Sequence, residues 1–205
     1  MSTEDLAFLT AVEQRHLIKT KKISPVELTR VYLDRIDRLD SSLNSYLTVS
    51  AEQAMVSAHS AEDAVVHGED LGPLHGVPIS IKDLEMTKGL RSTGGSLIFK
   101  NRVPEFDSIV VERVRKSGAI ILGKTNTPEF GLLGHTENRL GDHCRNPWNT
   151  ELTTGGSSGG AAAALSASQE ATPSQIQIAG LRELLLQHQA IVPIPEVTAI
   201  SEQRI

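Results

Sequence analysis

A cluster of glycines and serines at residues 153–165 is the part of the sequence best suited to chemistry. It reads Thr-Thr-Gly-Gly-Ser-Ser-Gly-Gly-Ala-Ala-Ala-Ala-Leu. Glycine permits backbone torsions that are closed to other residues, and alanine is the strongest helix former, so Ser157 and Ser158 are predicted to lie in a tight turn before a helix. Hydroxyl groups held at such a turn can take part in nucleophilic catalysis.

Three other interpretations of this cluster have less support. A flexible Gly/Ser linker is seldom followed directly by a run of helix formers. A phosphate-binding loop needs a lysine after its glycines, and no lysine follows Lys124. Residues 155–159 also match the G-x-S-x-G elbow of serine hydrolases, which requires an acid and then a histidine later in the chain. The available pairs are Glu170 or Glu183 with His188. Such a serine hydrolase is the second-ranked interpretation of the cluster.

A lysine offers a base other than histidine. Lys82 ends the apolar segment 77–81. Burial of its amine there would favour the neutral form, which can accept a proton from a serine. An isolated lysine at a strand end is usually solvated, but the residues around Lys82 favour a functional role.

The order of elements predicts how these residues are positioned. Ser24-Pro25-Val26-Glu27 has the N-cap serine, the first-turn proline and the glutamate of a helix start. Ser50 is predicted to cap a second helix that ends near Val66, and residues 3–18 have an amphipathic pattern. Three helices are therefore expected before the first strand.

Two apolar segments predict neighbouring strands. Residues 77–81 and 119–123 are separated by a helix that Asp107-Ser108 can cap and that runs through Lys116. A strand, a helix and a strand in this order imply parallel pairing, with helices on both faces of the sheet. The expected fold class is α/β.

Length, charge and composition limit the functional classes. A chain of 205 residues can form one domain that buries about 70% of its unfolded surface. Its net charge of −5 lacks the basic surplus of a nucleic-acid binder. Cys144 has no partner for an internal disulfide, residues 1–5 lack a signal-peptide core, and no apolar run approaches the length of about 20 residues that spans a bilayer. We expect a soluble cytoplasmic protein without nucleic-acid or membrane partners.

Four blocks together resemble the amidase signature family in order and spacing. They are residues 74–83, 123–131, 145–149 and 155–160, and the resemblance covers about residues 4–167. It implies hydrolysis of non-peptide amide bonds of a small substrate by a Ser-Ser-Lys triad, without a cofactor or a metal. It also implies an incomplete form of the family fold, with N-terminal helices followed by a partly parallel mixed sheet flanked by helices.

The resemblance assigns roles to individual residues. Lys82 matches the family's lysine, and Ser157 matches the bridging serine, which the family holds after a cis peptide bond. Gly155, Gly156, Ser158 and Gly159 form the supporting loop. In the family's mechanism the lysine takes a proton through the bridging serine from a second serine, which attacks the amide carbonyl.

No residue of this sequence matches the attacking serine. The family places it further along the chain, in a Gly-Gly-Ser segment after an aspartate, whose amides also form the oxyanion hole. Gly180-Leu181-Arg182 stands there, and Ser168 and Ser174 come too early. We therefore expect residues 1–167 to be the N-terminal part of the family domain, truncated before the nucleophile and inactive alone, and residues 168–205 to be a divergent tail.

Two further functions stay open. The A subunit of the glutamine-dependent transfer-RNA amidotransferases belongs to the same family, although residues 126–131 look more like those of general amidases. A non-catalytic binding protein, or a chain whose fold another subunit completes, would also retain these motifs.

The remaining notable residues have weaker claims. Asp83 could orient Lys82 or cap a turn. The spacing of His135, His143 and Cys144 fits no standard zinc pattern. Trp148 and Phe130 are predicted to pack under the loops of the site.

Overall fold

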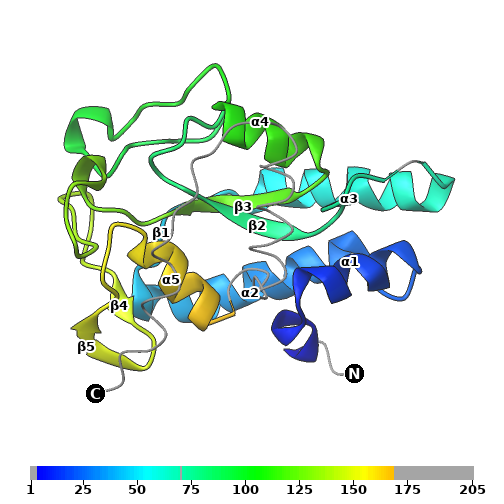
Figure 1. Ribbon diagram of the computed structural model, residues 1–205, viewed down its shortest axis with the longest axis horizontal. Coiled ribbons are helices and arrows are strands. Elements are labelled where there is room, and N and C mark those ends of the chain that lie inside the picture. Colours follow the sequence, from blue (N-terminus) through cyan, green and yellow to red (C-terminus); the bar gives the residue numbers. More distant parts are fainter. Residues whose placement is uncertain (1–3, 70, 169–205) are drawn as a thin grey trace, which may run out of the picture. The chain divides into compact units, whose positions relative to one another are not determined.

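The computed structural model describes residues 4–69 and 71–168. In this part of the chain a mixed three-stranded sheet has helices on both of its faces, which confirms the predicted α/β class (Figure 1). The elements in chain order are η1 (Glu4–Phe8), α1 (Ala11–Lys19), α2 (Pro25–Leu43), β1 (Tyr46–Val49), α3 (Ala51–His67), β2 (Pro78–Lys82), η2 (Leu97–Phe99), α4 (Ile109–Lys116), β3 (Ile120–Thr125), η3 (Glu129–Gly131), β4 (Arg145–Asn146), β5 (Asn149–Thr153) and α5 (Gly159–Ser166).

Two of the predicted helix starts are confirmed. The Ser24 hydroxyl accepts hydrogen bonds from the backbone amides of Val26 and Glu27, at 3.0 and 3.1 Å, and α2 follows. Ser108 caps α4 in the same way through the amide of Val111. These side chains satisfy amides that have no partner within the helix.

The predicted capping role of Ser50 is wrong, although α3 begins directly after it. The Ser50 hydroxyl makes no cap hydrogen bond and donates instead to the carbonyl oxygens of Ile121 and Leu122. Ser50 is buried against β3, so the strand carbonyls are its nearest acceptors. Its hydroxyl therefore joins a helix start to the central strand.

The predicted order of the N-terminal elements is also wrong in two respects. Residues 3–18 do not form one helix, because Thr10 and Glu13 make a capping box that starts α1 afresh after η1. In addition, β1 lies between α2 and α3, so a strand precedes the third helix. This strand has only four residues, too few for a clear alternating pattern.

The sheet has the order β1-β3-β2. Strands β2 and β3 are parallel, as predicted, with Ile81 opposite Lys124 and Lys82 opposite Thr125. Strand β1 pairs antiparallel with the other side of β3. All six residues of β3 are buried, as expected for a central strand with helices on both faces.

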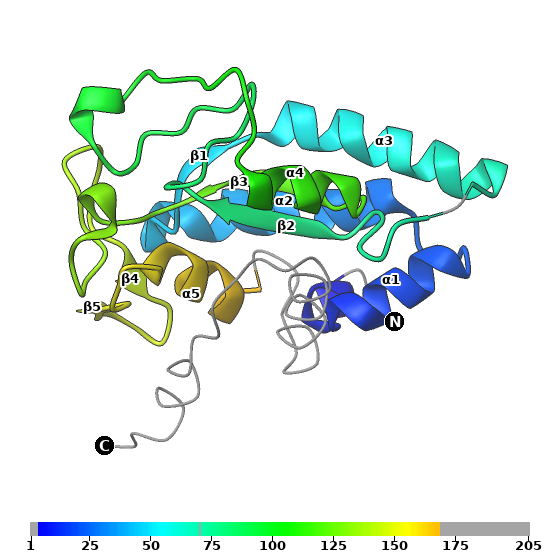
Figure 2. The same ribbon diagram turned by 45° about the horizontal axis from the view of Figure 1, so that its top comes forward.

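Each face of the sheet packs against its own apolar cluster. Ile120 and Leu122 belong to the cluster that includes α1, α2 and α3. Ile81 and Ile121 pack with Val111 and Val114 of α4 in the other cluster, together with Leu90. Figure 1 shows α4 on one side of the strands and α2 and α5 on the other, and Figure 2 shows α5 below β2. Side chains that alternate along β3 thus reach different layers.

A small second sheet completes the described part. Strands β4 and β5 form this antiparallel two-stranded sheet, which the sequence analysis did not predict. Among residues 4–69 and 71–168, no helix is both long and apolar enough to cross a bilayer.

Candidate active site

Lys82 lies against both serines of the glycine-serine cluster. It is the last residue of β2, and Ser157 and Ser158 immediately precede α5. The amine Nζ of Lys82 lies 2.8 Å from Ser157 Oγ and 2.9 Å from Ser158 Oγ. Two segments that lie 75 residues apart in the sequence are thereby joined at the carboxyl end of a parallel strand.

The backbone of residues 155–159, here called the serine loop, has an uncommon geometry. Gly155 has a φ of +72°, and the peptide bond between Gly156 and Ser157 is cis. The family resemblance implies this cis bond at Ser157. Ser158 occupies the cap position of α5 but makes no cap hydrogen bond, so its hydroxyl is free to accept from Lys82.

Two threonines fix the loop in place. Thr136 Oγ1 donates to the carbonyl oxygen of Gly155 at 2.9 Å and accepts from the amide of Gly159 at 3.0 Å. Thr127 Oγ1 donates to the carbonyl oxygen of Ser157 at 3.2 Å. A Cβ atom on Gly159 would lie 2.4 Å from Thr136 Oγ1, so only glycine permits this approach.

The environment of Lys82 shifts the protonation equilibrium of its amine toward the neutral form. Partial burial lowers the pKa of the amine, and the Glu85 carboxylate acts against this effect. A neutral amine keeps two protons and gains one lone pair. It can therefore donate to one serine hydroxyl while it accepts a proton from the other.

Asp83 does not orient Lys82. It is fully buried, and its carboxylate accepts hydrogen bonds from the amide of Thr93 at 2.9 Å and from the Thr93 hydroxyl. Burial raises the pKa of this carboxyl group, whereas Thr93 and the charge of Lys124 act against the rise. The side chain thus anchors the chain just after Lys82 to the segment around Thr93.

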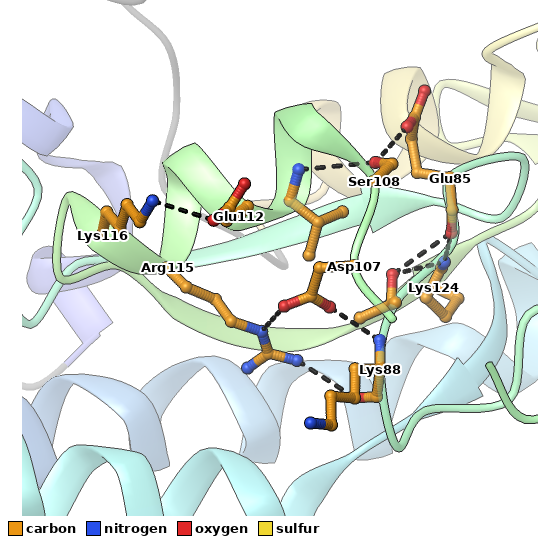
Figure 3. A network of polar contacts seen from close by, with 10 residues as sticks. Glu85, Lys88, Asp107, Ser108, Glu112, Arg115, Lys116 and Lys124 are labelled. Carbon is orange, nitrogen blue, oxygen red and sulfur yellow. Dashed lines mark hydrogen bonds and ion pairs between the residues drawn. The ribbon is translucent and has the colours of Figure 1, made fainter. Parts of the chain in front are cut away.

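Lys124 is a buried charged residue that the sequence analysis did not single out as part of the site. Its Nζ atom donates to the carbonyl oxygen of Glu85 (Figure 3), to Thr87 Oγ1 at 2.8 Å and to Ser92 Oγ at 3.0 Å. The side chain has no exposed surface. The available signal was a lysine directly after the apolar run 119–123, a context in which burial is expected.

A chain of polar contacts extends from Lys124 toward α4. The Glu85 carboxylate accepts from Ser108 Oγ at 2.6 Å, next to the start of that helix (Figure 3). Asp107 accepts from the amide of Lys88 at 2.6 Å and from Arg115 Nε at 2.9 Å. Residues 85–88 are therefore held from both the strand and the helix.

The predicted packing of the aromatic residues is wrong for Trp148. That side chain is 86% exposed at the turn between β4 and β5. Phe130 is also exposed, and it makes an edge-to-face contact with Phe99, with ring centroids 6.2 Å apart. It packs on η2 rather than under the serine loop.

His135 and His143 each pair with a nearby carboxylate, and Cys144 is a buried free thiol. His135 Nε2 lies 3.1 Å from Glu137 Oε1, and His143 Nδ1 lies 2.9 Å from Asp142 Oδ1. Burial raises the pKa of the Cys144 thiol to about 11. Within residues 4–69 and 71–168, no group of three or more His, Cys, Asp or Glu side chains could hold a metal ion.

Several predictions lie outside the described residues. They concern Ser174, the segment 180–188, and the acids Glu170 and Glu183 with His188. Ser168 is described, and its carbonyl oxygen accepts from Arg35 Nε at 2.8 Å at the end of α5.

The fold, and the contact between Lys82 and the serine loop, agree with one enzyme family. The profile of the Amidase family matches residues 27–172. The chain belongs to the amidase signature family.

Particular relatives are similar over most of this chain but over only part of their own length. The A subunit of the glutamyl-tRNA(Gln) amidotransferase of Geobacter sp. (strain M21) is 46% identical over 159 residues, which are 78% of this chain and 33% of that protein. The corresponding protein of Dehalococcoides mccartyi (strain CBDB1) is 43% identical over 80% of this chain and 34% of its own. The chain thus spans about a third of the length of these curated relatives.

Solved structures of the family share the same fold. A bacterial aryl acylamidase of the amidase signature family has a TM-score of 0.75 and 34% identity, with 79% of this chain and 34% of that chain covered. A fatty acid amide hydrolase has a TM-score of 0.79 and 25% identity, with 83% and 30% covered.

Proposed function

We propose that this chain carries the lysine-serine proton-transfer part of a site that cleaves carbon-nitrogen bonds of small amides. The observation that supports it best is the 2.8 Å contact between Lys82 Nζ and Ser157 Oγ. Family membership supports the choice of amides as the bond type.

In the proposed mechanism Lys82 begins as a neutral amine. It takes the proton of Ser157, and Ser157 takes the proton of an attacking hydroxyl. That oxygen adds to the amide carbonyl, the carbon-nitrogen bond breaks, and the relay returns one proton to the departing amine. Water then hydrolyses the acyl ester and restores the hydroxyl. Ser157 is accordingly a proton relay and not the nucleophile.

We further propose that the attacking hydroxyl and its oxyanion hole come from another polypeptide segment. In the described residues Lys82 Nζ donates to the hydroxyls of Ser157 and Ser158, and no Gly-Gly-Ser segment follows Gly160 in the sequence. Loss of an oxyanion donor costs about 3–4 kcal/mol, and loss of the nucleophile lowers turnover by about 10⁶-fold. The chain alone should therefore show little or no amidase activity.

The proton-transfer pair can be tested by NMR titration of the chain with ¹³C-labelled lysine side chains. Only eight lysines contribute signals, and the Lys82→Met variant identifies the signal of Lys82. We expect a midpoint below the ordinary lysine value. Ser157→Ala should lower it further, because the ammonium form loses one acceptor. Ser166→Ala, at an exposed position on α5, is the control. An ordinary midpoint for Lys82 would contradict the proposal.

Turnover of a simple aryl amide and labelling by a fluorophosphonate test the expected inactivity. Activity that Lys82→Ala abolishes would place a nucleophile within this chain and refute the second part of the proposal. Activity that survives Lys82→Ala but disappears in His188→Ala would favour a serine hydrolase that uses the G-x-S-x-G elbow of residues 155–159. Saturable binding of an amide without turnover would favour a binding protein.

The boundary at residue 167 is also a proposal. We propose that residues 1–167 form the family part and that residues 168–205 are a divergent segment of the chain. A chain that ends at residue 167 should then unfold in urea at the same midpoint as the whole chain. A markedly lower midpoint would contradict this division.

A second candidate function is that of one component of a transfer-RNA amidotransferase, supported by the 46% identity to the A subunit of a glutamyl-tRNA(Gln) amidotransferase. In that case the chain would assemble in the cytoplasm with partner subunits that complete the site. Co-purification with a transfer-RNA-binding partner, and glutamine-dependent amidation of glutamyl-tRNA by the complex, would support it. The net charge of −5 predicts that the isolated chain itself does not retain transfer RNA.

A further inference from the structure

Lys82 and Lys124 lie on opposite faces of the same two strands. Ile81 is the register partner of Lys124, so these two side chains share a face, whereas the next residue of β2, Lys82, points to the other face. The Ile81 face is covered by α4. Lys82 on the opposite face meets the serine loop.

The three hydrogen bonds of Lys124 all go to the segment that follows Lys82. Their acceptors are the carbonyl oxygen of Glu85, the hydroxyl of Thr87 and the hydroxyl of Ser92. Each hydroxyl uses its own proton elsewhere, since Thr87 donates to the Glu85 carbonyl and Ser92 donates to the Leu90 carbonyl. Both hydroxyls are therefore acceptors for Lys124, and three acceptors match the three protons of an ammonium group.

Further contacts close the turn between Lys82 and this segment. The amide of Asp83 donates to the carbonyl of Thr125 at 3.1 Å, which continues the pairing of β2 with β3 for one residue. The Asp83 carboxylate binds Thr93, and the amide of Gly94 donates to the Asp83 carbonyl at 3.0 Å. Lys124 therefore holds the chain from residue 85 onward, while β3 and Thr93 hold Asp83.

We propose that Lys124 is a positioning residue that keeps Lys82 partly buried and within hydrogen-bond distance of Ser157. The proposal rests on the function proposed above for Lys82. The physical reason is that β3 and Thr93 hold Asp83 alone, so a segment 85–92 without the Lys124 contacts would pull on the strand end and let the Lys82 amine swing into water. A buried ammonium with three acceptors resists that movement, because any displacement of residues 85–92 leaves a buried charge or a buried acceptor unpaired.

The test is the NMR titration of Lys82 in the whole chain with the Lys124→Met substitution. We expect the midpoint of Lys82 to rise toward the ordinary lysine value, because the amine becomes more hydrated. Lys116→Met is the matched control, since the side chain of Lys116 is 72% exposed and pairs with Glu112 on the same helix. The control should leave the midpoint of Lys82 unchanged.

A milder pair of variants covers the case in which Lys124→Met does not fold. Thr87→Val removes one acceptor without changing the shape of the side chain and should raise the midpoint in the same direction by a smaller amount. Thr29→Val is its control, because Thr29 is equally buried but its hydroxyl has no hydrogen bond within the described residues.

The outcomes distinguish the two proposals. If Lys124→Met or Thr87→Val lowers the melting temperature but leaves the Lys82 midpoint unchanged, Lys124 has a purely structural role and this inference is wrong. If Lys82 titrates at an ordinary value in the unaltered chain, the proposed function fails before the variants are compared.

Discussion

Replacing Lys124 by methionine should change how the stability of the folded chain depends on pH between about 8 and 10.5. Burial lowers the pKa of the Lys124 ammonium from 10.5 to about 8 in the folded chain, although the charges of Asp83 and Glu85 partly oppose this effect and Arg102 adds to it. Between these two pH values the unfolded chain holds a proton that the folded chain has lost. The free energy of unfolding therefore rises with pH across this interval.

The size of this effect follows from the two pKa values. They lie about 2.5 apart, and at about 1.4 kcal/mol for each pH unit the gain reaches about 3 kcal/mol. The Cys144 thiol acts in the opposite direction, because burial raises its pKa from 9.0 to about 11. There the folded chain holds the extra proton, so stability falls as the pH rises from 9 to 11, by a total of about 3 kcal/mol.

The assay is urea unfolding at a series of pH values from 7 to 10.5, followed by circular dichroism. Both chains carry Lys82→Met, so that the lysine of the site contributes nothing to the comparison. The chain with Lys124 should keep a nearly constant stability above pH 9, because the two effects oppose each other. The Lys124→Met chain should lose stability steadily there. Parallel pH curves for the two chains would refute the reasoning that Lys124 is desolvated in the folded state.

Three further predictions concern stability alone and use the same urea assay at neutral pH. Gly160→Ala places a Cβ atom 2.3 Å from a backbone nitrogen and should cost about 1–3 kcal/mol; Gly141→Ala, which meets nothing within 4 Å, should cost less than about 1 kcal/mol. Ser24→Ala removes the cap of α2 and should cost about 1 kcal/mol, whereas Ser57→Ala on the exposed side of α3 should change stability by less than about 0.5 kcal/mol. Trp148→Ala should have no measurable effect, because the side chain is 86% exposed; a loss above about 1 kcal/mol would mean that the indole is packed.

Local chemistry made much of the fold predictable. Ser24 and Ser108 cap α2 and α4 because their side chains satisfy helix amides. The parallel pairing of β2 and β3 follows from two apolar strands that a helix connects. The approach of Lys82 to the serine loop was implied by family resemblance and not by spacing, since the two segments are 75 residues apart. Their catalytic roles remain predictions.

Long-range packing decided the features that the sequence did not reveal. Ser50 looks like a cap, but burial against β3 gives its hydroxyl to strand carbonyls. Trp148 is predicted to pack under the loops of the site, but its side chain is exposed on a short hairpin. Asp83 looks like a partner for the adjacent Lys82, but it lies in the turn after β2 and its carboxylate binds Thr93 instead.

The two lysines at the strand ends show why residue type alone does not reveal function. Lys82 ends β2 on the face toward the serine loop, where partial burial lowers the pKa of its amine and two hydroxyls lie within reach. Lys124 lies near the end of β3 on the face toward α4, where three acceptors occupy all of its protons. Lys124 has no exposed surface and lies on the face toward α4, away from the serine loop, so it is poorly placed to exchange protons there, whereas its three contacts suit it to hold a turn. The same side chain therefore supports proton transfer on one face of the sheet and positioning on the other, and the register of β2 against β3 determines which lysine has which role.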